Sequence, residues 1–246
     1  MILKKKKGII FGIANDHSIA WGIAKKLKEQ GAELAITYQN EILLKRVKPL
    51  SEELDSNFLL KCDFSYKNSI KDCFDKLKSK WDNIDFVVHA AAFSDKKELD
   101  GNYINTSKDN FVNTLNISCY SFTEISKYAS KIMLNGGSLL TLSFYGANKV
   151  MPNYNVMGIA KAALETSVKY LSVDLGSKNI RVNAISSGPM RTVAGAAIAN
   201  AREVYKYTEK NSPLKRNVLL SEIGDSALYL VSDLSKAVSG EIHYVD

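Results

Sequence analysis

The chain has 246 residues, 46% of them hydrophobic, which is enough to bury one large core, so we expect a single domain over residues 1–246. Its formal charge of +7 comes mainly from scattered lysines rather than from a basic arm of the kind that binds nucleic acid. We find no apolar run long enough for a secretory signal or a membrane span. We therefore expect a cytoplasmic protein without nucleic-acid or membrane partners.

Helical repeats and apolar runs alternate along the chain. The repeats predict helices at 18–30, 41–54, 69–81 and 221–233, with a long helix or a bent pair at 107–134. The apolar runs predict strands at 8–11, 32–37, 58–61, 84–89, 138–142, 180–185 and 241–245. Strands of this kind, separated by helices, predict an α/β fold: a Rossmann-like, doubly wound parallel sheet of about seven strands with helices on both faces. Such sheets bind ligands beyond the carboxyl ends of their strands.

The first strand is followed by a turn rich in small residues, GIANDHSIAWG over residues 12–22. It is not G-x-G-x-x-G, but it places Gly12 where backbone must approach a diphosphate and Ser18 at the start of a helix. We expect Ser18 to act both as the helix N-cap and as a phosphate donor. A long, well-capped loop without a ligand explains the turn equally well.

The next two strand ends carry residues suited to the adenosine half of a dinucleotide. Gln39 stands where an acidic residue often binds the ribose, and its neutral amide leaves both NADH and NADPH open. Asp63 closes the third strand and could contact the adenine edge. A turn-forming aspartate is the alternative.

The later strand ends are also rich in small or hydroxylic residues. Three alanines occupy 90–92, the stretch LSFYG occupies 142–146, and GPMRT occupies 188–192. Gly-Pro forces a turn there, and Thr192 could bond a carboxamide or a phosphate. The small apolar residues that follow suggest a mobile lid over an apolar substrate, around residues 190–211, with a plain amphipathic helix as the alternative.

A further helix is predicted after Pro152, because proline is tolerated at the first helical position. Tyr154 and Lys161 are seven residues apart on it, so both side chains leave the same face, about 10 Å apart along the axis. A phenol and an ammonium beside a nucleotide are the parts of a proton donor with an electrostatic helper. Taken alone, they are better explained as two surface residues; the convergence of the strand ends reverses that interpretation.

The cysteines and histidines indicate no metal site. Cys62, Cys73 and Cys119 are odd in number and unpaired in spacing, which is typical of reduced thiols in a cytosol. His17, His89 and His243 lie far apart in the sequence and show no metal-ligand spacing.

The element order, the glycine turn and the Tyr/Lys helix resemble the short-chain dehydrogenases/reductases. Most of that family places its lysine four residues after its tyrosine, but here Met157 occupies the position that this spacing requires. The seven-residue interval and the strings PNYNVMGIAK, GIANDHSIAWG and RVNAISSGPMRT are instead similar to the divergent branch of bacterial enoyl-acyl-carrier-protein reductases. This similarity covers nearly the whole chain.

The resemblance implies an NADH-linked reduction of the trans-2 double bond of an acyl thioester in fatty-acid biosynthesis, with an acyl carrier protein as partner and a homotetrameric assembly. It implies that Tyr154 bonds the thioester oxygen and that Lys161 holds the nicotinamide ribose. Ser94 falls at a substrate-loop contact that is commonly alanine in the family. The positions at which the family contacts its dinucleotide are Gly12, Ser18, Ile19, Gln39, Asp63, Phe64, Ala91, Lys161, Met190, Arg191, Thr192, Val193 and Ala194.

Two departures from the family pattern are visible. Phe144 occupies the position of a second family tyrosine, and Tyr145 follows it, either as a substitute or with the second hydroxyl dispensable. We favour a dispensable hydroxyl, because adjacent side chains near a strand end point in different directions. Family members also continue past Asp246 with a short tail. Two other functions stay open at this point: a 3-oxoacyl or other carbonyl reductase, and an NADH-binding protein without chemistry.

Overall fold

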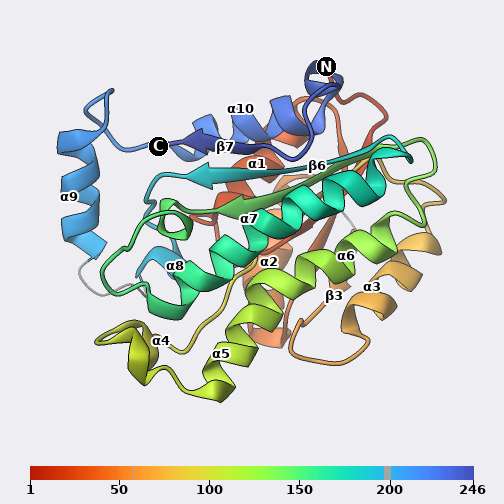
Figure 1. Ribbon diagram of the computed structural model, residues 1–246. Helices are drawn as coiled ribbons and strands as arrows, with labels where there is room; N and C mark the ends of the chain where they lie inside the picture. The colour runs from red at the N-terminus through yellow and green to blue at the C-terminus, as the bar shows by residue number, and fades with distance from the viewer. Residues whose placement is uncertain (57, 197–200) are drawn as a thin grey trace.

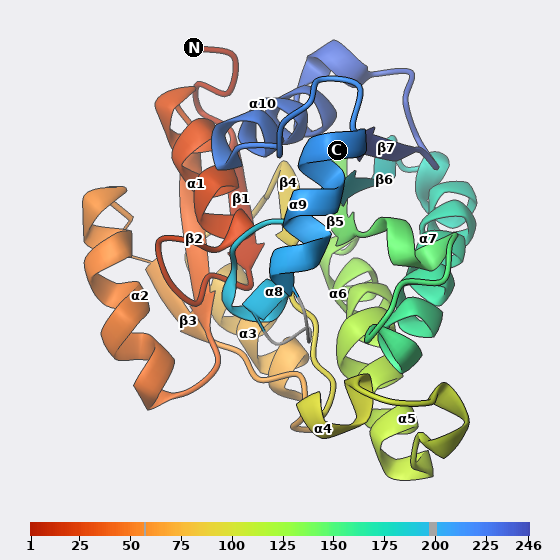
Figure 2. The same ribbon diagram turned by 90° about the vertical axis from the view of Figure 1, so that its left-hand side faces the viewer.

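The expected doubly wound sheet is present in the computed structural model, which describes residues 1–56, 58–196 and 201–246. Within these residues seven strands run parallel, with β6 and β7 side by side in Figure 1. Figure 2 labels all of them, in the order β3-β2-β1-β4-β5-β6-β7. Their bounds are β1 Lys7–Phe11, β2 Glu33–Tyr38, β3 Phe58–Lys61, β4 Phe86–His89, β5 Gly137–Ser143, β6 Ile180–Ser187 and β7 Ile242–Val245. The strand order reverses direction between β1 and β4, which is where a doubly wound sheet leaves room for a ligand.

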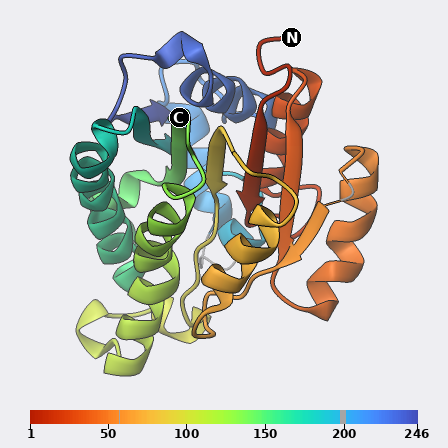
Figure 3. The same ribbon diagram turned by 90° about the vertical axis from the view of Figure 1, so that its right-hand side faces the viewer.

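Helices cover both faces of the sheet, as Figure 3 shows from the side. One layer contains α3 Ser69–Lys78, α6 Ser121–Ala129 and α7 Asn155–Gly176. The other contains α1 Ile19–Glu29, α2 Glu41–Glu53 and α10 Leu220–Val231. The remaining helices are α4 Lys96–Leu99, α5 Lys108–Leu115, α8 Val193–Ala196 and α9 Ala201–Asn211. No helix within the described ranges is long and apolar enough to cross a membrane.

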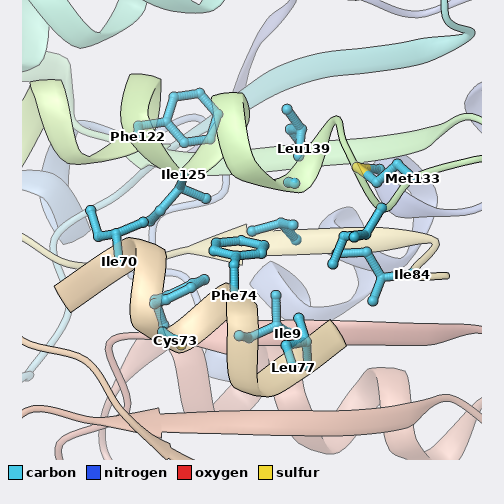
Figure 4. Close-up of a cluster of buried hydrophobic side chains, with 14 of the residues drawn as sticks. Ile9, Ile70, Cys73, Phe74, Leu77, Ile84, Phe122, Ile125, Met133 and Leu139 are labelled. Carbon is cyan, nitrogen blue, oxygen red and sulfur yellow. The ribbon is translucent and has the colours of Figure 1, made fainter. Parts of the chain in front are cut away.

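Alternation of side chains along each strand divides the core into two clusters. Ile9 of β1 packs under α3 and α6, whereas its neighbour Ile10 packs under α1 on the opposite face. Figure 4 shows the first cluster, in which Phe74 of α3 and Phe122 of α6 approach the sheet from the same side. Burial on both faces explains the apolar runs of β1 and β4, and buried polar side chains of β5 and β6, such as Ser138 and Asn183, donate to backbone carbonyls.

The expected long helix or bent pair at 107–134 is one helical run with a wider turn. Between α5 and α6 the chain forms a π-helical segment at Asn116–Tyr120. Within it the Ser118 hydroxyl donates to the Phe93 carbonyl and accepts from the Phe93 N–H, at 3.1 and 2.9 Å. The wider turn therefore ties the loop after β4 to this helical run.

The expectation that Pro152 opens α7 is wrong. The helix begins at Asn155, and Tyr154 is its N-cap residue. Asn153 has φ +59°, in the left-handed region, so a right-handed helix cannot run through it from Pro152. Tyr154 thus sits at the junction between a tight turn and the helix rather than inside the first helical turn.

Candidate active site

The predicted site residues lie at or near the carboxyl edge of the sheet. Figure 2 looks onto this edge, with α8 and α9 in front of it, between α1 and α7. Residues 197–200 of the expected lid lie outside the described residues.

Gly12 directly follows β1 and packs against Ala90, which directly follows β4. Its φ is +102°, and a Cβ there would clash with the backbone carbonyl of Ala90. Only glycine combines this backbone conformation with so close an approach. The turn after β1 is therefore held against the 90–92 segment, at the point where the sheet order reverses.

Ser18 lies at the N-cap position of α1, as expected, but its side chain does not cap the helix. Its hydroxyl accepts from the N–H groups of Ala14 and Asn15, at 3.0 and 3.1 Å, and so fixes the turn itself. Along α1, the N–H groups of Trp21 and Gly22 are the first to form helical hydrogen bonds, and both donate to the Ser18 carbonyl. The amides of Ile19 and Ala20 precede that first bond, and such amides form an anion-binding helix start.

Gln39 and Asp63 lie together, although they come from different strand ends. The Gln39 amide donates to one Asp63 carboxylate oxygen at 3.2 Å, and the other oxygen accepts from the N–H and the hydroxyl of Ser65. Asp63 is thus a turn-forming aspartate as well as a neighbour of Gln39. Phe64 stacks on His89, with ring centroids 5.7 Å apart.

Lys161 is buried, with 6% of its surface exposed. Its ammonium donates to the Leu142 carbonyl of β5 at 2.8 Å. Burial lowers the pKa of Lys161 to about 8, against an opposing effect of Cys119 and Glu165. At neutral pH the side chain still carries its charge.

Tyr154 is buried with Met157 in a small cluster that Leu99 closes. Burial, with the nearby Glu165 carboxylate, raises the pKa of the Tyr154 phenol, so the hydroxyl stays protonated and can donate. The ring of Phe144 meets Tyr154 edge-on, with centroids 5.1 Å apart. Tyr145 is 41% exposed in the short 3-10 turn Tyr145–Ala147.

The Ser94 hydroxyl bonds within the protein. It accepts from Thr114 Oγ1 at 3.0 Å and from Asn110 Nδ2 at 3.2 Å. The side-chain Oδ1 of Asn110 in turn accepts from the Asp95 N–H at 2.9 Å. This network fixes the loop after β4 on α5.

The segment before α8 is also bonded internally. Thr192 Oγ1 accepts from the Gly195 N–H at 2.9 Å, and the Met190 carbonyl accepts from the Tyr205 hydroxyl of α9 at 2.7 Å. Arg191 lies over the Tyr205 ring, and Val193 is exposed.

Two buried polar residues were not among the predicted site residues. His89 contacts Thr141 Oγ1 through Nδ1 and Ser121 Oγ through Nε2, at 2.8 and 2.9 Å. Glu165 accepts from Ser143 Oγ at 2.6 Å and is 8% exposed. Glu165 could have been found, because it follows Lys161 by four residues on the same helix face. No signal in the sequence distinguished His89 from an ordinary strand end.

Within the described residues, no group of histidines, cysteines and acids could hold a metal ion. Cys62, Cys73 and Cys119 are free thiols.

The parallel doubly wound sheet, the small-residue turn after β1 and the buried Tyr154 and Lys161 at the start of α7 are the features of a Rossmann-like protein of the short-chain dehydrogenase/reductase type. A profile of the family described as "Enoyl-(Acyl carrier protein) reductase" matches residues 12–246. The chain belongs to this enoyl-acyl-carrier-protein reductase family, as the resemblance implied.

Relatives and solved structures agree with this placement. The chain is 59% identical to "Enoyl-[acyl-carrier-protein] reductase [NADH] 2" of Rhizobium meliloti, over all of this chain and 91% of the relative. The crystal structure of FabI from Candidatus Liberibacter asiaticus has a TM-score of 0.98 at 55% identity, over all of this chain and 95% of that one. The Anaplasma phagocytophilum reductase in complex with NAD has a TM-score of 0.97 at 54% identity, over all of this chain and 94% of that one.

Proposed function

We propose that this protein is an NADH-dependent enoyl-acyl-carrier-protein reductase, which reduces the trans-2 double bond of an acyl thioester in fatty-acid biosynthesis. The observation that carries the proposal is the buried pair of Tyr154, the N-cap residue of α7, and Lys161 on that helix, seven residues apart. Met157 lies between them in the sequence and packs in the same buried cluster as Tyr154. A carbonyl reductase of the same scaffold needs a phenol at the Met157 position, and a thioether cannot donate a proton. High identity to NADH-named reductases over the whole chain supports the same function.

The residues at the carboxyl edge fit a dinucleotide. Gly12 lets the turn after β1 pass close to the backbone at Ala90. The amides of Ile19 and Ala20 form a helix start suited to a diphosphate. Gln39 and Asp63 present polar groups for adenosine. Phe64, Ala91 and residues Met190–Ala194 would complete the contacts. NADH, when bound, supplies the hydride that adds to the β carbon.

Tyr154 and Lys161 carry the chain's part of the chemistry. The Tyr154 hydroxyl donates to the thioester oxygen, where negative charge develops as the double bond is reduced. Its raised pKa keeps it a donor and prevents a competing phenolate. Lys161 holds the nicotinamide ribose and adds a positive field beside the developing charge.

The substrate would enter between the Ser94 loop and a lid around residues 190–211. Ser94 itself is bonded to α5, so in this proposal its contribution is to hold the loop beside the acyl thioester. The net charge of +7 suits docking of an acidic acyl carrier protein. Raising the ionic strength should then raise KM for the carrier-bound substrate, and an unchanged KM would argue against steering.

A homotetramer is proposed from the apolar residues that α5, the π segment and α7 leave on the surface. These are Val112, Tyr120, Ile159, Tyr170 and Val173, all at least 40% exposed. Apolar surface of this kind favours burial between subunits. Sedimentation should give four times the chain mass of 27.2 kDa, and a monomer would contradict the assembly. A cytoplasmic location is proposed because the three cysteines are free thiols.

The decisive experiment is NADH oxidation followed by absorbance, with crotonyl thioester and acetoacetyl thioester in parallel. We expect turnover of the crotonyl thioester alone. Turnover of acetoacetyl thioester alone would identify a carbonyl reductase, and NADH binding without turnover of either would identify a binding protein. NADPH in place of NADH tests the cofactor preference in the same assay.

A further inference from the structure

Three consecutive residues at the end of β5 each hold a different residue of the α7 region. The Leu142 carbonyl accepts from Lys161 Nζ at 2.8 Å. The Ser143 hydroxyl donates to Glu165 Oε1 at 2.6 Å. The Phe144 ring packs edge-on against Tyr154, with centroids 5.1 Å apart. The hydrogen bond between Ser143 and Glu165 joins two side chains, and neither of them has a part in the proposed chemistry.

Glu165 also holds the turn that follows β5. Its second oxygen accepts from Asn148 Nδ2 at 3.0 Å, and the same amide donates to the Tyr244 hydroxyl of β7 at 3.0 Å. This turn lies against α7 by backbone contact as well: a Cβ on Gly158 would be 2.9 Å from the Gly146 carbonyl oxygen. The Glu165 carboxylate therefore fastens both the end of β5 and the following turn to the helix that carries Tyr154 and Lys161.

We propose that Glu165 is a positioning residue for the reaction: with Ser143 and Asn148 it sets the register of α7 against the end of β5, and so places the Tyr154 hydroxyl and the Lys161 ammonium. The inference rests on the proposed function and adds a residue to it. Because Leu142, Ser143 and Phe144 are adjacent, a shift at the Ser143 contact moves the neighbours of Lys161 and Tyr154 together.

The carboxylate acts on Lys161 by its charge as well. Besides burial, the groups that affect the pKa of Lys161 are Cys119 on the π segment and Glu165 on α7, while the Lys161 charge itself helps to lower the pKa of the buried His89 on β4. Glu165 and Cys119 raise the pKa of Lys161, whereas burial lowers it to about 8. Tyr244 of β7 shares the Asn148 amide with Glu165, and burial, with Glu165, Tyr145 and Asp246, raises the pKa of Tyr244. Removing the Glu165 charge should therefore lower the pKa of Lys161 further and deprotonate it at a lower pH.

The chain offers variants that separate charge from hydrogen bonding. Glu165→Gln keeps the size and one acceptor oxygen but loses the charge and presents an amide to Asn148. Ser143→Ala removes the register bond and leaves the charge, and Ser143→Thr restores a hydroxyl in a residue that strands favour. Glu52→Gln makes the same chemical change on an exposed position of α2 and is the matched control.

The experiment measures kcat, KM for NADH, the pH profile of kcat and the melting temperature for each variant with crotonyl thioester. We expect Glu165→Gln to lower kcat by about tenfold or more and to move the alkaline limb of the profile to lower pH, with KM for NADH changed by less than about threefold. Ser143→Ala should lower kcat without moving the limb, Ser143→Thr should recover most of the loss, and Glu52→Gln should match the wild type.

Wild-type kcat and an unmoved alkaline limb in Glu165→Gln would overturn the inference while leaving the proposed function standing. A wild-type protein that reduces no enoyl thioester would overturn the proposed function itself, and the two failures are therefore distinct. If Glu165→Gln does not fold, Ser143→Ala decides: a normal melting temperature with undiminished kcat would overturn the inference.

Discussion

Phe144 stands edge-on to Tyr154, with ring centroids 5.1 Å apart and an interplanar angle of 68°. By the resemblance, Phe144 takes the position of a second family tyrosine, and its ring packs against the ring of Tyr154. Edge-to-face aromatic pairs contribute about 0.5–1.5 kcal/mol beyond their buried area. Phe144 therefore fixes the plane of the Tyr154 ring, and the Tyr154 hydroxyl is left as the phenol donor of this pair.

Tyr154→Phe tests that donor directly. The variant keeps the ring and its contact with Phe144 but loses the hydroxyl that we propose stabilises charge on the thioester oxygen. We expect kcat to fall by about 10²–10³, as for the loss of one oxyanion-hole donor. Affinity for NADH, measured by fluorescence titration, should be unchanged. An undiminished kcat would remove Tyr154 from the chemistry.

Phe144→Tyr tests whether the second hydroxyl is dispensable. The substitution adds a hydroxyl at the edge of a half-buried ring, and we expect kcat within about threefold of the wild type, since the donor to the thioester oxygen is already present. Phe144→Leu removes the aromatic edge and should lower kcat more than Phe144→Tyr does. A rise of tenfold or more in Phe144→Tyr would show that the second hydroxyl matters.

The pattern of apolar runs predicted every strand of the sheet to within two residues, because most of these parallel strands, buried on both faces, contain a short apolar run. Local signals near the site were less informative. Pro152 suggested a helix start, but the left-handed Asn153 delays the helix to Asn155. Backbone conformation at a single asparagine is decided by the packing of the turn, which the linear pattern does not contain.

Side-chain partners were the least predictable part of the site. The Ser18 hydroxyl was expected at a phosphate, but it bonds back to the turn amides of Ala14 and Asn15. The Ser94 hydroxyl bonds to Asn110, sixteen residues away. Such contacts depend on how α5 and the β4 loop meet in three dimensions. The seven-residue spacing of Tyr154 and Lys161 was visible in advance, but it singled out the pair only together with the strand ends that converge on the same edge of the sheet.

Gly12→Ala should disrupt the site through the backbone. A Cβ would clash with the Ala90 carbonyl, at a φ of +102° that alanine rarely adopts, so we expect a loss of about 3 kcal/mol or more in the free energy of unfolding, with NADH binding weakened. Gly176→Ala is the control, because a Cβ there meets nothing within 4 Å and the residue ends α7. It should be neutral or stabilise by up to about 1 kcal/mol. If urea unfolding gives Gly12→Ala and Gly176→Ala the same free energy of unfolding, this role of Gly12 is contradicted.

The charge of Lys161 should set the alkaline limit of activity. Burial holds its pKa at about 8, so the ammonium is lost as the pH rises through that value. We expect kcat to fall above about pH 8 with a single titration. Lys161→Arg, which keeps the charge at all pH values measured, should remove the alkaline limb even where its overall activity is low. An alkaline limb that persists in Lys161→Arg belongs to another group.

His89 should make the fold sensitive to acid. Its ring is fully buried between Thr141 and Ser121, and burial, with the nearby Lys161 charge, lowers its pKa to about 3 from an ordinary value near 6.5. Below pH 6.5 the unfolded chain takes up a proton that the folded chain does not, so stability falls as the pH is lowered from about 6.5 toward 3. The slope for this one group is about 1.4 kcal/mol per pH unit. Urea unfolding at several pH values should show it, and His89→Gln, which cannot titrate, should have a shallower slope by that amount. Equal slopes in the two proteins would mean that His89 is protonated in the folded state.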